Sequence, residues 1–345
     1  MLTEISMDEW EKLVDHLPDK MVFHHSGWLL TLSETYHFPL HIIGYKENGR
    51  LLSALPMMQV RSLRGEKHTV SLPFTDFLSV PAVTPEARTN LLQEIGSAPG
   101  NHWEKLEIRD HITDNRSWHL VQSDWLHMID LSGDMTVLEK RFSSNHRKSL
   151  AVAKKRGAEP RISTDEKSVH DFYALHVKTR KRKGLPVQPK RFFDKIYQHL
   201  IQGGHGGIVG VYTQNQMVAG GLYLTYGDVM TIKFNASDSD YLHLRPNHLV
   251  YYELMRLGMS QGYKQLDWGK TAVSNEGLRQ FKLGWGAVEK PLFYSHLGTN
   301  TAEGTTEYDE TAQVGGLLRY VSWVIKVSPA FVCRWAGELF YRYLS

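Results

Sequence analysis

Three side chains in this sequence have the types needed for transfer chemistry at a carbonyl carbon. Asp76 and Asp267 each lie next to a strand-like segment and beside aromatic residues, so either could accept a proton from an attacking amine. Attack on an ester or thioester builds negative charge on the carbonyl oxygen, and a fixed ammonium at Lys282 could stabilise it. Each has a structural alternative: an aspartate at a strand end often caps the following turn, and the lysine could be exposed at the start of a loop.

The densest motifs surround two of these residues. Leu244-Arg245-Pro246-Asn247-His248 precedes a helix-forming stretch, and Leu266-Asp267-Trp268-Gly269 ends a strand. Gly277-Leu278-Arg279-Gln280-Phe281-Lys282-Leu283-Gly284-Trp285-Gly286 follows. Asn247 beside Pro246 suits the opening of a helix, and contact with substrate is the alternative.

Positive charge is concentrated in the middle of the chain. Arg141 through Arg191 contains 15 basic and 4 acidic residues, whereas the whole chain carries a net charge of only +3. Such a segment could bind a pyrophosphate, a nucleotide-linked sugar or an RNA acceptor stem, and a solvated basic face is the alternative. The candidate contacts are Arg147, Lys148, Lys154 and Arg180.

The elements that must position these residues occur twice. Residues 44–55 predict a strand, an Asn-Gly turn and a second strand, and residues 210–221 repeat this pattern. A helix-forming segment precedes each hairpin, and a helix and a strand follow it. Two copies of one mixed α/β unit account for this order.

Two helices are predicted to connect the copies. Residues 137–157 have apolar positions at helical spacing among basic ones, which predicts an amphipathic basic helix, and residues 167–183 predict a second helix. A Thr-, Gly- and acid-rich linker spans 298–316. The predicted organisation is therefore residues 1–136, residues 137–297, the linker, and a tail at 317–345.

The order of the motifs resembles that of the Fem-type aminoacyltransferases and their acetyltransferase relatives. In these proteins a Pro-Asn pair opens a helix, a strand ends in Asp-x-Gly, and a Gly-Leu-x-x-Phe-Lys-x-x-(Trp/Phe)-Gly element follows. Asn145-His146-Arg147-Lys148, Asn235-Ala236-Ser237 and Pro73-Phe74-Thr75-Asp76-Phe77 match as well. The resemblance covers residues 20–297. It implies an α/β fold of mixed sheets with two tandem GNAT-like domains, and transfer of an acyl or aminoacyl group to an amine or hydroxyl.

The resemblance also implies roles for single residues. Lys282 matches a functionally important lysine of the Fem enzymes, Phe281 precedes it, and Arg279 of the same element is a candidate substrate contact. The acceptor that the resemblance implies is a cell-envelope precursor of peptidoglycan or polysaccharide.

The identity of the acyl donor stays open between aminoacyl-tRNA and acetyl-CoA, with no tightly bound cofactor. Acetyl-CoA enzymes of this fold usually carry a glycine-rich loop whose amides hold the pyrophosphate at a helix N-terminus. Residues 202–207 are glycine-rich but precede a strand, which weakens the case for acetyl-CoA and leaves room for aminoacyl-tRNA. The alternatives are an acetyl-CoA-dependent transferase in exopolysaccharide synthesis and a non-catalytic nucleic-acid-binding protein that retains the fold.

Several classes of protein are disfavoured. The acidic first 25 residues contain no signal-peptide pattern, and the single cysteine, Cys333, has no partner for a disulfide, so a cytoplasmic location is predicted. The 18 histidines show no metal-ligand spacing, and we expect no metal site.

The tail at 317–345 interleaves aromatic and basic residues, which predicts two short amphipathic helices on the inner face of the membrane. Packing of the same aromatics onto the second domain is the alternative.

Overall fold

The computed structural model describes residues 1–62, 65–97, 105–113, 118–297 and 316–343. They form two compact units: unit 1 contains residues 1–124, 291–307 and 342–345, and unit 2 contains residues 125–290 and 308–341. The division falls within strands β6 (Trp118–Asp130) and β12 (Val288–Leu297), because each strand contributes residues to both units. Residues 125–136 thus belong to unit 2 and residues 291–297 to unit 1. The predicted boundaries at 136 and 297 instead place residues 125–136 in the first domain and residues 291–297 in the second. The predicted linker lies outside the described residues except for Gly316.

Unit 1 contains a mixed sheet. Its strands lie in the order β1 (Leu2–Glu4), β2 (Leu40–Glu47), β3 (Arg50–Arg61), β4 (Lys67–Val70), β5 (Leu106–Ile108) and the end of β12. Its helices are α1 (Met7–Asp15), α2 (Ser26–Tyr36) and α3 (Pro85–Ser97). The turn between β2 and β3 has φ angles of 51° at Asn48 and 78° at Gly49. Two left-handed residues are what a two-residue type I′ hairpin requires.

Unit 2 contains the remaining strands. Its strands lie in the order β6, β11 (Gln265–Ala272), β10 (Val229–Ser237), β9 (Gln216–Tyr226), β8 (Gly206–Thr213) and β7 (Glu159–Ser163). The hairpin of β8 and β9 turns through Gln214 and Asn215, whose φ angles are 50° and 61°. Its core includes Leu254, Trp268 and Trp285.

The same order of elements occurs in both units. In unit 1 it is α2, β2, β3, β4, α3 and β5, and in unit 2 it is α7 (Lys190–Ile196), β8, β9, β10, α8 (Pro246–Ser260) and β11. In each case the last strand pairs in parallel with the strand before the helix, β5 with β4 and β11 with β10. The predicted α/β fold with two tandem units is confirmed.

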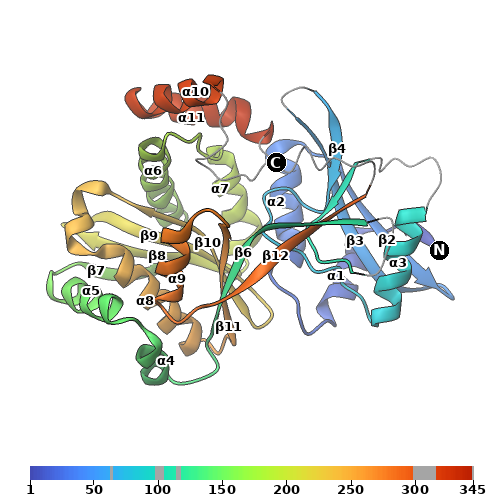
Figure 1. Ribbon diagram of the computed structural model, residues 1–345, viewed down its shortest axis with the longest axis horizontal. Helices are drawn as coiled ribbons and strands as arrows, with labels where there is room; N and C mark the ends of the chain where they lie inside the picture. The colour runs from blue at the N-terminus through green and yellow to red at the C-terminus, as the bar shows by residue number, and fades with distance from the viewer. Residues whose placement is uncertain (63–64, 98–104, 114–117, 298–315, 344–345) are drawn as a thin grey trace. The chain divides into compact units, whose positions relative to one another are not determined.

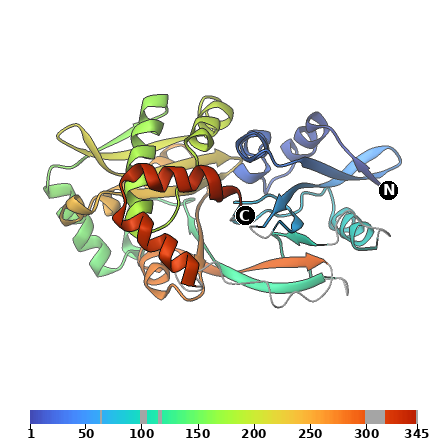
Figure 2. The ribbon, with the colours of Figure 1, turned by 90° about the horizontal axis from the view of Figure 1, so that it is seen from above.

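Helices cover both faces of the sheet in unit 2 (Figure 1, Figure 2). Adjacent residues of a strand point to opposite faces. A Cβ at Gly220 would lie 3.0 Å from Phe172 of α6 (Glu166–Lys183), and a Cβ at Gly221 would lie 2.9 Å from Leu254 of α8. Helices α6 and α8 therefore lie on opposite faces, and α5 (Ser144–Lys155) packs against α8.

The basic helix predicted over 137–157 is two helices, α4 (Met135–Arg141) and α5. The prediction of one helix was wrong because Phe142 and Ser143 have extended backbone, with ψ angles of 139° and 154°. Phe142 is buried with its ring 4.9 Å from that of Trp285, and the Ser143 side chain caps α5 by accepting from the backbone N of His146 at 3.2 Å. The predicted second helix is α6, which ends at the left-handed residue Gly184.

The tail forms the two short helices expected from its sequence. They are α10 (Gly316–Val327) and α11 (Ala330–Phe340), separated at Pro329, and both contact α6. Among the described residues, each helix is too short or too polar to cross a membrane.

Candidate functional site

The parallel strands β10 and β11 separate after a short paired stretch. Pairing joins only Val229–Thr231 to Gln265–Asp267, although β10 continues to Ser237 and β11 to Ala272. Backbone groups of β11 beyond Asp267 therefore need partners other than β10, because buried carbonyls are almost always hydrogen-bonded.

The ammonium of Lys282, in α9 (Glu276–Leu283), is such a partner for three backbone oxygens of β11. Its Nζ donates to the backbone oxygens of Trp268 at 2.9 Å, Gly269 at 3.0 Å and Lys270 at 3.2 Å. Successive carbonyls of a regular strand point to opposite edges, but Gly269 has a φ of 68° and kinks β11 so that all three approach one ammonium. Lys282 is only 4% exposed, so the alternative of an exposed loop lysine is wrong. The ammonium is a fixed, buried positive charge.

Asp267 lies at the end of the paired stretch and is 1% exposed. Its Oδ1 accepts from the backbone N of Gly269 at 2.8 Å, and its Oδ2 accepts from the Thr231 hydroxyl at 3.3 Å. These bonds hold the kink that brings the carbonyls to Lys282. The environment favours the turn-capping alternative, and the role of Asp267 as a base stays a prediction.

Phe281 lies in a cluster of aromatic and histidine rings. Its ring centroid is 5.0 Å from that of His146, 5.7 Å from His248 and 5.6 Å from Tyr251. The Nδ1 of His146 lies 2.8 Å from the Ser143 hydroxyl. Both histidines occur within the motifs that carry the resemblance, but no spacing in the sequence marks them as a pair.

Asn247 lies in the first turn of α8, which has no side-chain cap. Its Nδ2 donates to the Ser237 hydroxyl at 3.3 Å. Its Oδ1 is buried and has no hydrogen-bond partner within the part of the chain that the structure describes. A buried acceptor without a partner costs free energy unless a ligand or water supplies a donor.

Arg279 is held by an ion pair. Its guanidinium donates to both oxygens of Glu289, at 2.8 and 3.1 Å, and lies 4.6 Å above the ring of Trp125. The Nε2 of His127 lies 3.4 Å from the Glu289 carboxylate. The guanidinium of Arg279 is thus already bound to Glu289, and its contact with substrate stays a prediction.

Two histidines, the buried His127 and the half-buried His248, make the folded protein sensitive to acid. Burial and the charge of Lys282 lower the pKa of His127 to about 4, and burial together with His146 and Arg245 lowers the pKa of His248 to about 4. Between pH 6.5 and 4 the unfolded chain therefore binds more protons than the folded chain, so the free energy of unfolding should fall as pH falls through this range.

Urea unfolding at pH 7 and pH 5 measures this dependence. The loss between the two should be smaller in His127→Gln than in the original chain, and His243→Gln, at an exposed position, is the control. An equal loss in all three proteins would contradict the assignment.

The candidate basic residues do not form one surface. Arg147, Lys148 and Lys154 are exposed on α5, whereas Arg180 lies on α6, on the opposite face of the sheet. Arg147 donates to the backbone oxygen of Phe142, and the Nζ of Lys154 lies 3.9 Å above the ring of Tyr252. The Nε of Arg180 donates to the backbone oxygen of Pro186 at 3.0 Å. One anionic group cannot contact both sets.

Asp76 belongs to unit 1, in a segment fixed by three side chains. Arg109 donates to the backbone oxygen of Thr75 at 2.6 Å, and the Tyr294 hydroxyl donates to that of Asp76 at 2.8 Å. The Trp28 indole donates to the Thr75 hydroxyl at 2.8 Å. Arg109 also interacts electrostatically with the Asp76 carboxylate. The sequence did not single out Arg109, because it is an isolated arginine at the end of a short strand.

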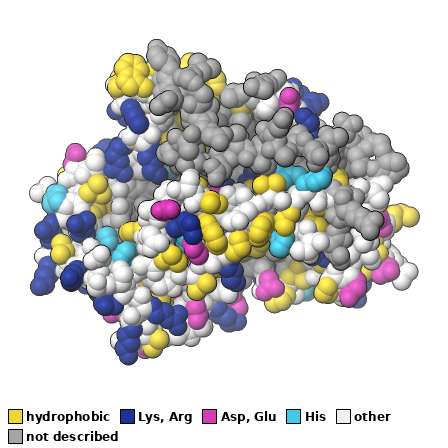
Figure 3. Space-filling view, in the orientation of Figure 1, with side chains coloured by type: hydrophobic (Ala, Val, Ile, Leu, Met, Phe, Trp, Pro, Cys, Tyr) yellow, Lys and Arg dark blue, Asp and Glu magenta, His cyan; other side chains and the backbone are white. Residues whose placement is uncertain are grey.

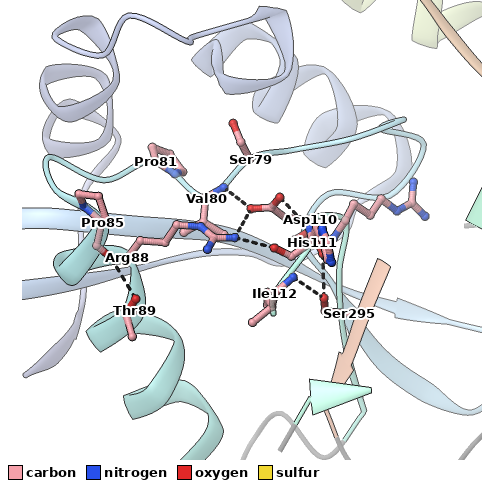
Figure 4. Close-up of polar contacts among 12 residues, drawn as sticks. Ser79, Val80, Pro81, Pro85, Arg88, Thr89, Asp110, His111, Ile112 and Ser295 are labelled. Atoms are coloured by element: carbon pink, nitrogen blue, oxygen red, sulfur yellow. Dashed lines mark hydrogen bonds and ion pairs between the residues drawn. The ribbon is translucent and has the colours of Figure 1, made fainter. Parts of the chain in front are cut away.

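Unit 1 also contains a pocket of about 860 Å³ with side chains of both charges in its lining. Asp110 belongs to its lining, and Figure 4 shows this residue in a network of polar contacts. The carboxylate accepts from Arg88 and from the Val80 backbone N, both at 2.9 Å, and from the His111 backbone N at 2.8 Å. These bonds give Asp110 a structural role. The described residues contain no group of three His, Cys, Asp or Glu side chains that could hold a metal ion.

Comparison with known proteins identifies the class of domain. Residues 140–287 match the family model of the acetyltransferase (GNAT) domain. No curated protein sequence is significantly similar to the chain. GNAT enzymes use acyl-CoA as a substrate and hold no tightly bound cofactor.

Solved structures extend the likeness over both units. FemX aligns with a TM-score of 0.68 at 14% identity, over 86% of this chain and 97% of FemX. The C-terminal domain of a putative lysylphosphatidylglycerol synthetase from Agrobacterium fabrum aligns with a TM-score of 0.57 at 12% identity, over 86% and 93%. The L-PGS structure from Bacillus licheniformis gives 0.52 at 11% identity, over 94% and 98%. The predicted resemblance to the Fem and GNAT proteins is confirmed: residues 140–287 match a GNAT-type acetyltransferase domain, and the chain has a FemX-like fold.

Proposed function

We propose that the protein transfers an acyl or aminoacyl group to an amine or hydroxyl of a cell-envelope precursor, a peptidoglycan or polysaccharide intermediate. The observation that carries the proposal is the buried ammonium of Lys282 where β10 and β11 separate, within the segment that matches the GNAT domain. The FemX-like fold supports the class of reaction, and the acceptor rests on the resemblance of the motifs.

Lys282 is proposed to act on the reacting carbonyl group through the electric field of its positive charge. Its hydrogen bonds go to three carbonyls, so its positive charge would stabilise the oxyanion from a fixed position without a rearrangement during the reaction. The buried Oδ1 of Asn247 is the proposed contact for a donor group of the substrate. Asp76 of unit 1 stays the other candidate for the general base, because both oxygens of Asp267 accept bonds in the interior.

The proposed donor is aminoacyl-tRNA, with acetyl-CoA as the alternative. The glycine-rich residues 202–207 form the turn before β8 and the first two residues of that strand, while the first turn of α8 begins with Pro246 and Asn247. A proline and an asparagine give a different first turn from a glycine-rich phosphate loop. A polyanion as large as tRNA suits the exposed cations of α5, which include Arg147, Lys148 and Lys154.

Titration with coenzyme A and with charged tRNA separates the two donors. We expect tRNA to bind, and Lys154→Glu to weaken binding about tenfold and reduce its dependence on salt. Arg180→Glu, on the other face of the sheet, tests whether α6 contributes and should have a smaller effect.

Two outcomes would contradict this assignment. Binding of coenzyme A alone would support an acetyl-CoA-dependent transferase of exopolysaccharide synthesis. Binding of tRNA without acyl transfer to any acceptor would support a nucleic-acid-binding protein that retains the fold.

A cytoplasmic location, with peripheral contact at the inner face of the membrane through the tail, completes the proposal. Such a position would bring the enzyme to an acceptor that is lipid-linked.

A further inference from the structure

The two helices of the tail present apolar side chains to solvent at every fourth position. The exposed residues, here called the apolar stripe, are Trp323 (57%), Val327 (60%), Phe331 (61%), Trp335 (62%) and Leu339 (43%). Residues four apart lie on the same face of a helix, so each helix has one apolar face toward solvent. An exposed apolar surface of this kind marks a site of interaction with another protein or with a membrane.

The opposite face of α11 packs on the rest of unit 2. Cys333, Ala336 and Gly337 are buried, and the Cys333 thiol donates to the backbone oxygen of Leu185 at 3.3 Å. Helix α10 contributes Ile325, which is 1% exposed. One face of these helices is therefore buried against the rest of unit 2, and the apolar stripe on the other face stays exposed to solvent. The alternative in which the tail's aromatics pack onto the second domain does not hold for Trp323, Phe331 and Trp335.

Cations border the apolar stripe. The Nζ of Lys181, at the end of α6, donates to the backbone oxygen of Lys326 at 3.1 Å, so the basic run 180–183 lies against α10. Arg334 is exposed on α11, and Glu338, the acidic residue of this helix, lies 4.0 Å from Arg191. Figure 3 shows hydrophobic side chains over α10 and α11 with Lys and Arg side chains directly below them.

We propose that α10 and α11 bind the surface of a bilayer that contains anionic phospholipid. The apolar stripe would enter the boundary between headgroups and acyl chains, and the bordering cations would contact the lipid phosphates. A second copy of the chain is a poorer partner, because its stripe would bring an equal set of cations against the first. An anionic surface instead neutralises these charges.

Co-sedimentation of the full chain with vesicles tests the proposal without any acyl donor or acceptor, so its outcome is independent of the transfer chemistry. Binding should be at least tenfold stronger to phosphatidylcholine vesicles containing phosphatidylglycerol than to phosphatidylcholine alone. The double variant Phe331→Ser with Trp335→Ser should lose at least tenfold in binding. The matched control is Val137→Ser, at an exposed apolar position on α4.

A second pair of substitutions tests the cations that border the apolar stripe. Lys326→Gln with Arg334→Gln should remove most of the preference for phosphatidylglycerol. The control is Lys264→Gln, at an exposed lysine that precedes β11 and pairs with Asp228, and it should not change this preference. Three results would overturn the proposal: no sedimentation with anionic vesicles at low salt, equal binding by the serine variants, or self-association in solution that the serine variants abolish. The last result would assign the apolar stripe to a second copy of the chain.

Discussion

Replacement of Lys282 with alanine is expected to destabilise the protein as well as reduce its turnover more than tenfold. The change removes the donor of three hydrogen bonds and leaves the backbone oxygens of Trp268, Gly269 and Lys270 buried without it. A buried carbonyl left unsatisfied costs about 1–3 kcal/mol, so a total loss of about 3 kcal/mol or more is expected. Urea unfolding followed by tryptophan fluorescence measures the loss.

A lysine that acts only on the transition state could be replaced without loss of the fold, which is the expectation from the sequence alone. The structure changes that expectation and makes a stability-matched control necessary. Leu254→Ala removes a buried side chain between α8 and β9 and should cost about 2–5 kcal/mol without touching the Lys282 ammonium.

Turnover of both variants is compared at a temperature where each is fully folded. A loss specific to Lys282→Ala supports the proposed electrostatic role. Equal turnover in the two variants would show that Lys282 acts through the fold alone.

The tandem architecture was predictable because local rules determine the elements that repeat. Asn48-Gly49 has the residues that a type I′ turn selects, and Gln214-Asn215 adopts the same left-handed pair at the corresponding point of unit 2. The alternation of hairpin, helix and strand then requires a parallel pairing at the end of each copy, which the structure contains.

The site was less predictable because it depends on tertiary contacts. No sequence pattern states that β10 and β11 separate after three residue pairs, and this separation makes the carbonyls of β11 available to Lys282. The break at Phe142 also comes from tertiary packing, since the apolar spacing of 137–157 suits one continuous helix. The basic segment was treated as one surface, yet a sheet lies between α5 and α6.

The second large effect is expected for Gly337→Ala in α11. A Cβ at this position would lie 1.8 Å from the backbone oxygen of Val187 and 2.9 Å from its carbonyl carbon. Neither atom belongs to a flexible side chain, so α11 would have to move away from unit 2. Cys333 lies one turn earlier and is the only cysteine, which makes it a reporter of this movement.

The thiol is buried, and burial raises its pKa, so reaction with a thiol reagent should be slow while α11 is packed. In Gly337→Ala the labelling rate should rise at least tenfold. Gly277→Ala is the matched control: its Cβ would meet nothing within 4 Å on α9, so the change should stabilise the protein by about 0.4–1 kcal/mol and leave the labelling rate unchanged. If Gly337→Ala labels as slowly as the original chain, α11 is not packed against Val187. The apolar stripe would then lack the defined orientation on which its proposed contact with lipid depends.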